Sequence, residues 1–181
     1  MKREETLILA TAGTVAGILL IVLIVLLVRY LLAKRTSEET MQQFQNTALP
    51  RGYRNNNPLN IRISSEHWLG KVSRNTDGSF EQFSAMEYGY RAAIKTLQTY
   101  IRKHHCDTIE KIITRWAPPS ENNTQAYIAN VANRAGLSPT ETITPTNHDQ
   151  LTAIVYAMAI SENGFTPQPN RQAIETAWAM L

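Results

Sequence analysis

The chain has 181 residues, enough for one domain and an N-terminal appendage. Its formal net charge of +3 comes from the first 35 residues, because basic and acidic residues are equal in number from Thr36 onward. A neutral domain without a basic run argues against a nucleic-acid-binding protein. The single cysteine, Cys106, excludes an intrachain disulfide.

The N-terminal segment from Leu7 to Val28 carries no charged residue. At about 22 residues it is long enough to cross a bilayer core as a helix. No cleavage site follows it, which favours a retained anchor over a signal peptide. We therefore predict a membrane anchor over residues 1–35, with its transmembrane part at about 7–28.

This anchor predicts a single-pass membrane protein that contacts lipid through its N-terminal helix. Basic residues flank both ends of the apolar run, so its orientation stays open. Gly13 and Gly17 form a GxxxG pattern, which is found where membrane helices pack and makes a homo-oligomer one interpretation.

A polar linker is predicted at residues 36–50, followed by one domain at residues 51–181. The domain opens with short apolar pieces, and residues 75–78 have the composition of a hairpin turn. We predict a small, irregular antiparallel sheet of two or three short strands there. The asparagines at 55–57 are expected either to hydrogen-bond the backbone in tight turns or to contact a ligand.

From Ser84 onward the sequence is helical. Capping-box patterns at residues 84–87 and 107–110 open two helices, and a third is predicted over residues 124–135 with Gly136 as its stop. A fourth opens at residues 147–150, and a closing helix covers residues 171–180. The predicted fold class is therefore α+β, mainly α.

The fourth helix holds the candidate catalytic residue. Leu151, Ile154, Val155 and Met158 recur at i, i+3, i+4 and i+7, and the same face next reaches Glu162. A carboxylate at the end of a core-facing stripe is costly to bury as an anion, and a carboxyl group that holds its proton is what a general acid needs. The alternative is that Glu162 turns outward at a frayed helix end, or pairs with an arginine.

Other chemistry is not indicated by the sequence. The histidines lack metal-ligand spacing, and there is no P-loop, dinucleotide fingerprint or nucleophile elbow. No metal or cofactor is therefore expected.

Several segments of the domain resemble a known family. RGYRNNNPLNIR, IITRWAPPSENNTQAYIANVA and SENG are similar to a phage and prophage family of virion or lysozyme-like proteins, over about residues 51–169. AISENGFTPQP resembles the stretch of lytic transglycosylases in which a helix ends in the catalytic glutamate. NNPLNIR is similar to a segment of flagellar-type glucosaminidases, and ENNTQAYI to a late transglycosylase motif with a conserved tyrosine. In those families the glutamate helix comes first, so the resemblance implies a circularly permuted lysozyme-like domain.

The resemblance implies an enzyme that cleaves the β-1,4 glycan strand of peptidoglycan, most simply a lytic transglycosylase. With the predicted anchor, it also implies a location in a virion membrane or a bacterial envelope, with the domain facing the cell wall. Glu162 would protonate the glycosidic oxygen and then take a proton from a sugar hydroxyl, and Tyr127 would hydrogen-bond near that centre. The substrate-binding residues expected are Asn57, Asn60, Arg62, Trp68, Phe83 and Asn163. A hydrolase would need a second carboxylate, for which Glu66, Asp77 and Glu81 are candidates.

Two other functions stay open. A phage virion structural or ejection protein could keep a lysozyme-like fold without activity. A membrane adaptor that binds a protein partner would need a large exposed apolar patch, which the sequence does not indicate. The sequence also leaves open the choice between transglycosylase and hydrolase, virion and host envelope, and the oligomeric state.

Overall fold

The computed structural model describes residues 20–36, 38 and 48–181. The chain divides into two compact units, Met1–Ala48 and Leu49–Leu181. In the first unit, residues 20–36 are helical and their side chains are exposed.

The predicted transmembrane helix, and with it the single-pass membrane location, is contradicted. Within the residues that the structure describes, no helix combines the length and the apolarity that a bilayer crossing requires. Arg29 interrupts the apolar sequence of the helix at 20–36, and Lys34 and Arg35 lie near the end of that helix. Residues 7–19 of the predicted span lie outside the described residues, as do the glycines of the GxxxG pattern.

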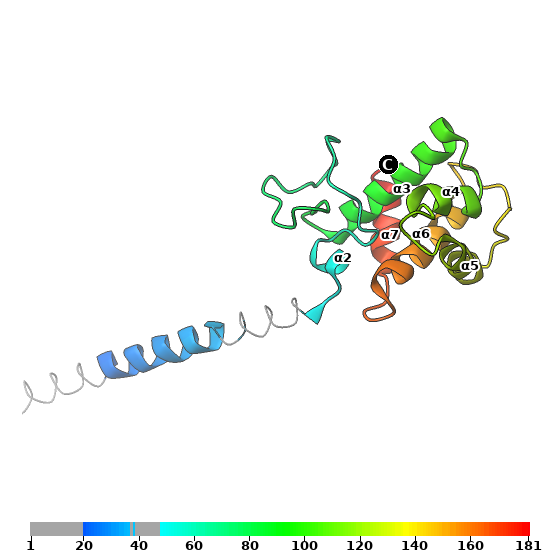
Figure 1. Ribbon diagram of the computed structural model, residues 1–181. Coiled ribbons are helices and arrows are strands. Elements are labelled where there is room, and N and C mark those ends of the chain that lie inside the picture. The colour runs from blue at the N-terminus through cyan, green and yellow to red at the C-terminus, as the bar shows by residue number, and fades with distance from the viewer. Residues whose placement is uncertain (1–19, 37, 39–47) are drawn as a thin grey trace, which may run out of the picture. The chain divides into compact units, whose positions relative to one another are not determined.

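The second unit is an assembly of short and medium helices (Figure 1). In chain order they are α2 (Arg51–Arg54), α3 (Met86–His104), α4 (Ile109–Trp116), α5 (Thr124–Ala135), α6 (His148–Asn163) and α7 (Arg171–Ala179).

Helix α6 is the centre of this assembly, and it packs against α2, α3, α5 and α7. It is buried on more than one face, because the small residues Ala157 and Ala159 are as inaccessible as the larger apolar ones around them. Those larger residues are Leu151, Ile154, Val155, Met158 and Ile160. Most side chains in the middle of α6 are therefore buried, and its more exposed C-terminal end carries Glu162.

Asparagine side chains start three of the helices. Asn123, Asn147 and Asn170 are the N-cap residues of α5, α6 and α7, and each accepts a hydrogen bond from the backbone N–H three residues later. The bounds of α5 match the sequence prediction, and α6 ends before Gly164 as expected. The capping box predicted at Ser84 is wrong, because α3 begins after Ala85 and no side chain caps it.

The predicted antiparallel sheet is also contradicted, and the described part of the domain is helical without a strand. Residues 55–85 form an irregular loop with two isolated antiparallel bridges, Arg62 with Phe80 and Lys71 with Phe83. The amide of Asn57 accepts from the N–H of Ile61 and donates to the carbonyl oxygens of Ile61 and Glu81, all at 2.9 Å. Because a buried side chain occupies backbone groups that a neighbouring strand would use, the bridges do not extend into a ladder.

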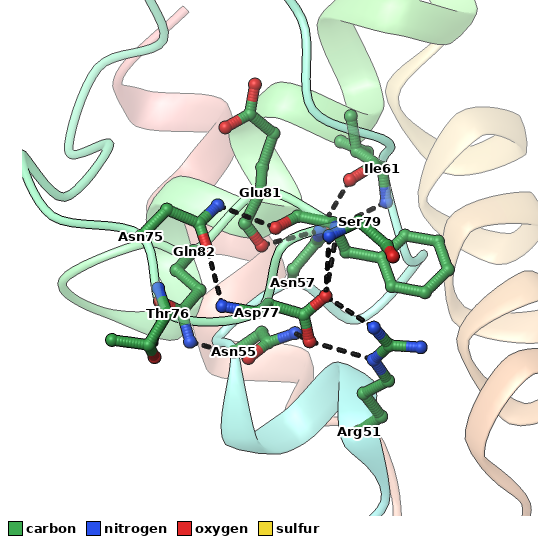
Figure 2. A network of polar contacts seen from close by, with 11 residues as sticks. Arg51, Asn55, Asn57, Ile61, Asn75, Thr76, Asp77, Ser79, Glu81 and Gln82 are labelled. Atoms are coloured by element: carbon green, nitrogen blue, oxygen red, sulfur yellow. Dashed lines mark hydrogen bonds and ion pairs between the residues drawn. The ribbon is translucent and has the colours of Figure 1, made fainter.

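Asp77 organises the far side of this loop (Figure 2). Its carboxylate accepts from Nε and Nη2 of Arg51 at 2.8 and 2.6 Å, from Nδ2 of Asn55 at 2.7 Å, and from the backbone N–H groups of Ser79 and Phe80. The Arg51 guanidinium, with Asn55 and the two N–H groups, holds the pKa of Asp77 far below its usual range. This network joins helix α2 to the tip of the loop.

A histidine links α6 to α7, and it predicts a pH dependence of stability. Nδ1 of His148 lies 3.0 Å from Asp149, Nε2 lies 2.9 Å from Glu175, and the ring packs beside Trp178. Asp149, and then Glu175, raise the pKa of His148. A raised folded-state pKa gives stabilisation that is complete below the unfolded pKa of about 6.5 and is lost as the pH rises through the folded value.

We therefore expect the stability advantage of the native chain over a His148→Gln variant to be larger at about pH 5.5 than at about pH 8.5. Urea unfolding of both proteins at the two pH values measures this difference. An advantage that is the same at both pH values, or larger at the higher one, would show that the protonated ring does not stabilise this contact.

Candidate active site

A groove of about 590 Å³ opens at the C-terminal end of α6. Its walls come from the irregular loop, from α3, from the end of α4, from the α4–α5 connection and from the start of α5. The residues that line it and carry polar or aromatic groups are Asn60, Arg62, Phe80, Thr96, Tyr100, Trp116, Glu121, Asn122, Tyr127 and Glu162.

The carboxyl group of Glu162 accepts three hydrogen bonds in this groove. The Tyr127 hydroxyl donates to Oε1 at 2.7 Å, and the Trp116 indole Nε1 donates to the same oxygen at 3.2 Å. Nδ2 of Asn60 donates to Oε2 at 3.0 Å. All three donors are neutral, and no ion pair to Glu162 is found among the described residues. The carboxyl group is therefore fixed in position without a cation holding it as an anion.

These donors converge because three separate segments meet the last turn of α6. Tyr127 lies in the first turn of α5, which packs against α6, and Trp116 is the last residue of α4. Asn60 belongs to the loop, where a backbone φ of 52° places it in the left-handed region that asparagine tolerates.

The loop is held against α6 by the residue that follows Glu162. Nδ2 of Asn163 donates to the carbonyl oxygens of Pro58 at 2.7 Å and of Ala159 at 3.0 Å. Gly52 of α2 allows this close approach, since a Cβ atom there would collide with Oδ1 of Asn163. Asn163 thereby fixes the distance between Glu162 and the loop that carries Asn60.

Tyr127 stays protonated in this setting. Burial and the neighbouring carboxylate of Glu162 both raise the pKa of Tyr127, burial being the larger effect. A phenol hydroxyl can donate to a carboxylate or accept from a protonated carboxyl group. Tyr127 can therefore keep its hydrogen bond to Glu162 in either protonation state.

Asn60 can also form a hydrogen bond with either protonation state of Glu162. Its Oδ1 atom is buried and has no hydrogen-bond partner, while its Nδ2 atom donates to Glu162. A half-turn of the amide would replace the donor with an acceptor that can take a hydrogen bond from a protonated Glu162. The site can thus hold either form of the carboxyl group, as proton transfer requires.

The structure brings four of the residues predicted from the sequence into this groove: Asn60, Arg62, Tyr127 and Glu162. The other four, Asn57, Asn163, Phe83 and Trp68, do not line the groove. Asn57 is buried with its amide bonded to the backbone, and Asn163 clamps the loop. Phe83 is a core residue, and Trp68 packs against the same core.

The three carboxylates considered for a hydrolase also lie outside the groove lining. Asp77 is bound by Arg51, and Glu81 is fully buried and paired with Lys71 at 2.9 Å. Glu66 is exposed elsewhere on the loop. The carboxylate that shares the groove with Glu162 is Glu121, which pairs with Arg62 at 3.6 Å.

Sequence reasoning missed the contributions of Trp116, Tyr100 and Glu121. Trp116 faces inward like a core residue in the helical pattern of residues 109–116, and its indole N–H is what makes it a site residue. Trp116 and Glu121 both lie in the motif RWAPPSEN, so the resemblance contained a signal for them. Tyr100 lines the groove from α3 without any motif that marks it.

Comparison with known proteins identifies a phage relationship. No family model matches the chain. A curated relative, Protein P5 of Pseudoalteromonas phage PM2, is 41% identical over 120 residues, which span 65% of this chain and 73% of the relative. This supports the phage part of the resemblance seen in the sequence, whereas a lysozyme-like family is not shown. The chain belongs to the family of the bacteriophage PM2 protein P5.

Proposed function

We propose that this phage-type protein cleaves the β-1,4 glycan strand of peptidoglycan, as a lytic transglycosylase with Glu162 as its catalytic acid and base. The observation that carries the proposal is the carboxyl group of Glu162, held by Tyr127, Trp116 and Asn60 in an open groove. Aromatic and amide side chains beside a positioned carboxyl group suit a carbohydrate ligand.

The reaction needs one proton-transfer group and no water. Protonated Glu162 gives its proton to the glycosidic oxygen as the bond from that oxygen to C1 breaks. The C6 hydroxyl of the same sugar then attacks C1, and its proton passes to the Glu162 carboxylate. The products are a free 4-hydroxyl end and a 1,6-anhydro end, and Glu162 regains its starting state.

The arrangement of carboxylates favours this route over hydrolysis. A glycosidase of the usual kind needs a second carboxylate free to act as nucleophile or base. Glu121 is the second carboxylate of the groove, and its contact with Arg62 engages it in an exposed ion pair at the rim. A single-carboxylate mechanism does not require Glu121 to leave that pair.

Tyr127→Phe tests the hydrogen bond at the centre of this mechanism. We expect kcat on peptidoglycan to fall about 10-fold with KM little changed, because one hydrogen bond to a charged group is lost and the ring remains. Initial rates of the two proteins measure this effect. Tyr156→Phe is the matched control, since Tyr156 is partly buried on α6 but does not line the groove. Equal losses in both variants would contradict the assigned role of Tyr127.

The proposed function is tested by incubating the full chain with purified peptidoglycan sacculi. We expect soluble glycan fragments to appear in the supernatant over time, and sedimentation of the sacculi to remove part of the protein from solution. A folded protein that sediments with sacculi and releases nothing from walls of several bacterial types would overturn the catalytic proposal.

A second candidate function is a structural component of a phage particle without catalytic activity. The family relationship to a phage protein supports it, because that relationship indicates a phage role and does not by itself imply catalysis. The sacculus experiment separates the two functions, since a structural component releases no glycan. Detection of the chain in purified particles that show no wall-degrading activity would support the structural function.

A further inference from the structure

A second groove of about 370 Å³ lies next to the Glu162 site, and Tyr127 lines both. Its walls are one face of α5 and the residues around the C-terminal end of α6. Its lining residues include Tyr127, Asn130, Arg134, Ser161 and Phe165. Ser161 immediately precedes Glu162, so this groove borders the reacting centre.

Arg134 is the charged side chain of the second groove. Its guanidinium lies 4.3 Å from the centroid of the Phe165 ring, an aromatic residue that is 54% exposed. In the part of the chain that the structure describes, no carboxylate pairs with Arg134. Stacking on a ring fixes the plane of the guanidinium and leaves the N–H donors at its edge available.

A guanidinium that has no carboxylate partner is suited to a carboxylate, which it can bind with two parallel hydrogen bonds. The neighbouring residue Asn130 adds amide groups to the same groove, one helical turn away on α5. Peptidoglycan carries carboxylates on the peptide stems attached to alternate sugars of the strand. Because Tyr127 lines both grooves, a substituent of a strand whose glycosidic bond lies at Glu162 is within reach of the second groove.

We infer that the groove at Arg134 and Phe165 binds a carboxylate of the peptide stem, so that the protein acts preferentially on strands that keep their peptides. This inference rests on the proposed glycan-cleaving function. Arg134 is then a specificity-determining residue that holds the strand through its substituent, while Glu162 and Tyr127 act on the glycosidic bond.

The test compares peptide-bearing glycan strands with the same strands after an amidase has removed their peptides. For Arg134→Gln we expect KM on peptide-bearing strands to rise about 10-fold with kcat little changed, because a bidentate charged contact is lost. On the peptide-free strands the variant should behave like the native chain. Removal of the peptides should also raise the KM of the native chain, and it should leave the KM of Arg134→Gln nearly unchanged.

Arg171→Gln is the matched control. Arg171 stacks on Tyr156 at 4.3 Å, the same distance as Arg134 on Phe165, but it lies outside both grooves. The Arg171→Gln substitution should not change the activity on either kind of strand. Equal activity of Arg134→Gln and the native chain on both substrates would overturn the inference, as would an equal loss on both.

Failure of the inference can be told apart from failure of the proposed function. If the native chain cleaves both kinds of strand and Arg134→Gln does not discriminate between them, the catalytic proposal stands and the stem-binding groove is refuted. If the native chain is folded and cleaves neither strand, both proposals fall together.

Discussion

Glu162→Gln should lower kcat on peptidoglycan about 1,000-fold while leaving the protein folded. An amide matches the carboxyl group in size but cannot give a proton to a leaving oxygen, and proton transfer by a positioned group typically contributes 10²–10⁴-fold. Initial rates of glycan release from labelled peptidoglycan, with both proteins at equal concentration, measure the loss.

The site should accept this substitution without rearrangement. The amide oxygen of a glutamine can accept from Tyr127 and Trp116 as Oε1 does now, and the unpartnered Oδ1 of Asn60 can accept from the new amide N–H after a half-turn. Circular dichroism and urea unfolding should therefore match the native chain. Retention of more than about a tenth of the native rate would show that Glu162 is not the proton donor.

Lys71→Met should lower the free energy of unfolding by about 3–5 kcal/mol. Lys71 pairs with Glu81 at 2.9 Å and also donates to the carbonyl oxygen of Ser64 at 3.0 Å. The side chain of Glu81 is 0% exposed, so the substitution leaves a buried carboxylate without its counter-charge. Urea unfolding of the full chain measures the change.

Two further variants separate the buried charge from other effects. Lys71→Met combined with Glu81→Met should recover most of the lost stability, because an apolar pair of similar size can replace a buried ion pair. Lys111→Met removes a lysine from an exposed pair with Asp107 and should change stability little. Equal losses for Lys111→Met and Lys71→Met would show that burial of Glu81 is not the cause.

The helices of the domain were accessible to sequence reasoning because their signals are local. Asn147 and Gly164 bound α6 by a cap at one end and a stop at the other, and the apolar period between them gives its buried faces. Extended by one turn, the same helical period places Glu162 on the core-facing side. The three neutral donors around Glu162 could not be derived in this way, because Trp116 lies 46 positions before it and Asn60 lies 102 positions before it.

The irregular loop was mispredicted for a related reason. Its short apolar pieces and its turn composition are those of a hairpin, and its backbone groups do need partners. Some of those partners are other backbone groups, but the amide of Asn57 takes the place of a strand at the carbonyl oxygen of Glu81, across 24 positions. The side chain of Arg51 in turn holds that of Asp77 across 26 positions. Neither contact has a periodic signature, so the sequence pattern favoured a sheet that the structure replaces with a polar network.

The second groove had no sequence signal at all. Arg134 is one exposed basic residue among several, and Phe165 lies two residues beyond the end of α6. Their stacking at 4.3 Å depends on how α5 packs against α6, which is a property of the fold and not of either segment.

If Glu162 alone drives cleavage of the glycan strand, the full chain should release fragments with new 1,6-anhydro ends from purified peptidoglycan, and these ends should be lost with Glu162→Gln. Mass spectrometry of the released fragments measures them. Hydrolysed reducing ends would contradict the single-carboxylate mechanism, and a folded chain that yields no new ends of either kind would contradict the enzymatic function itself.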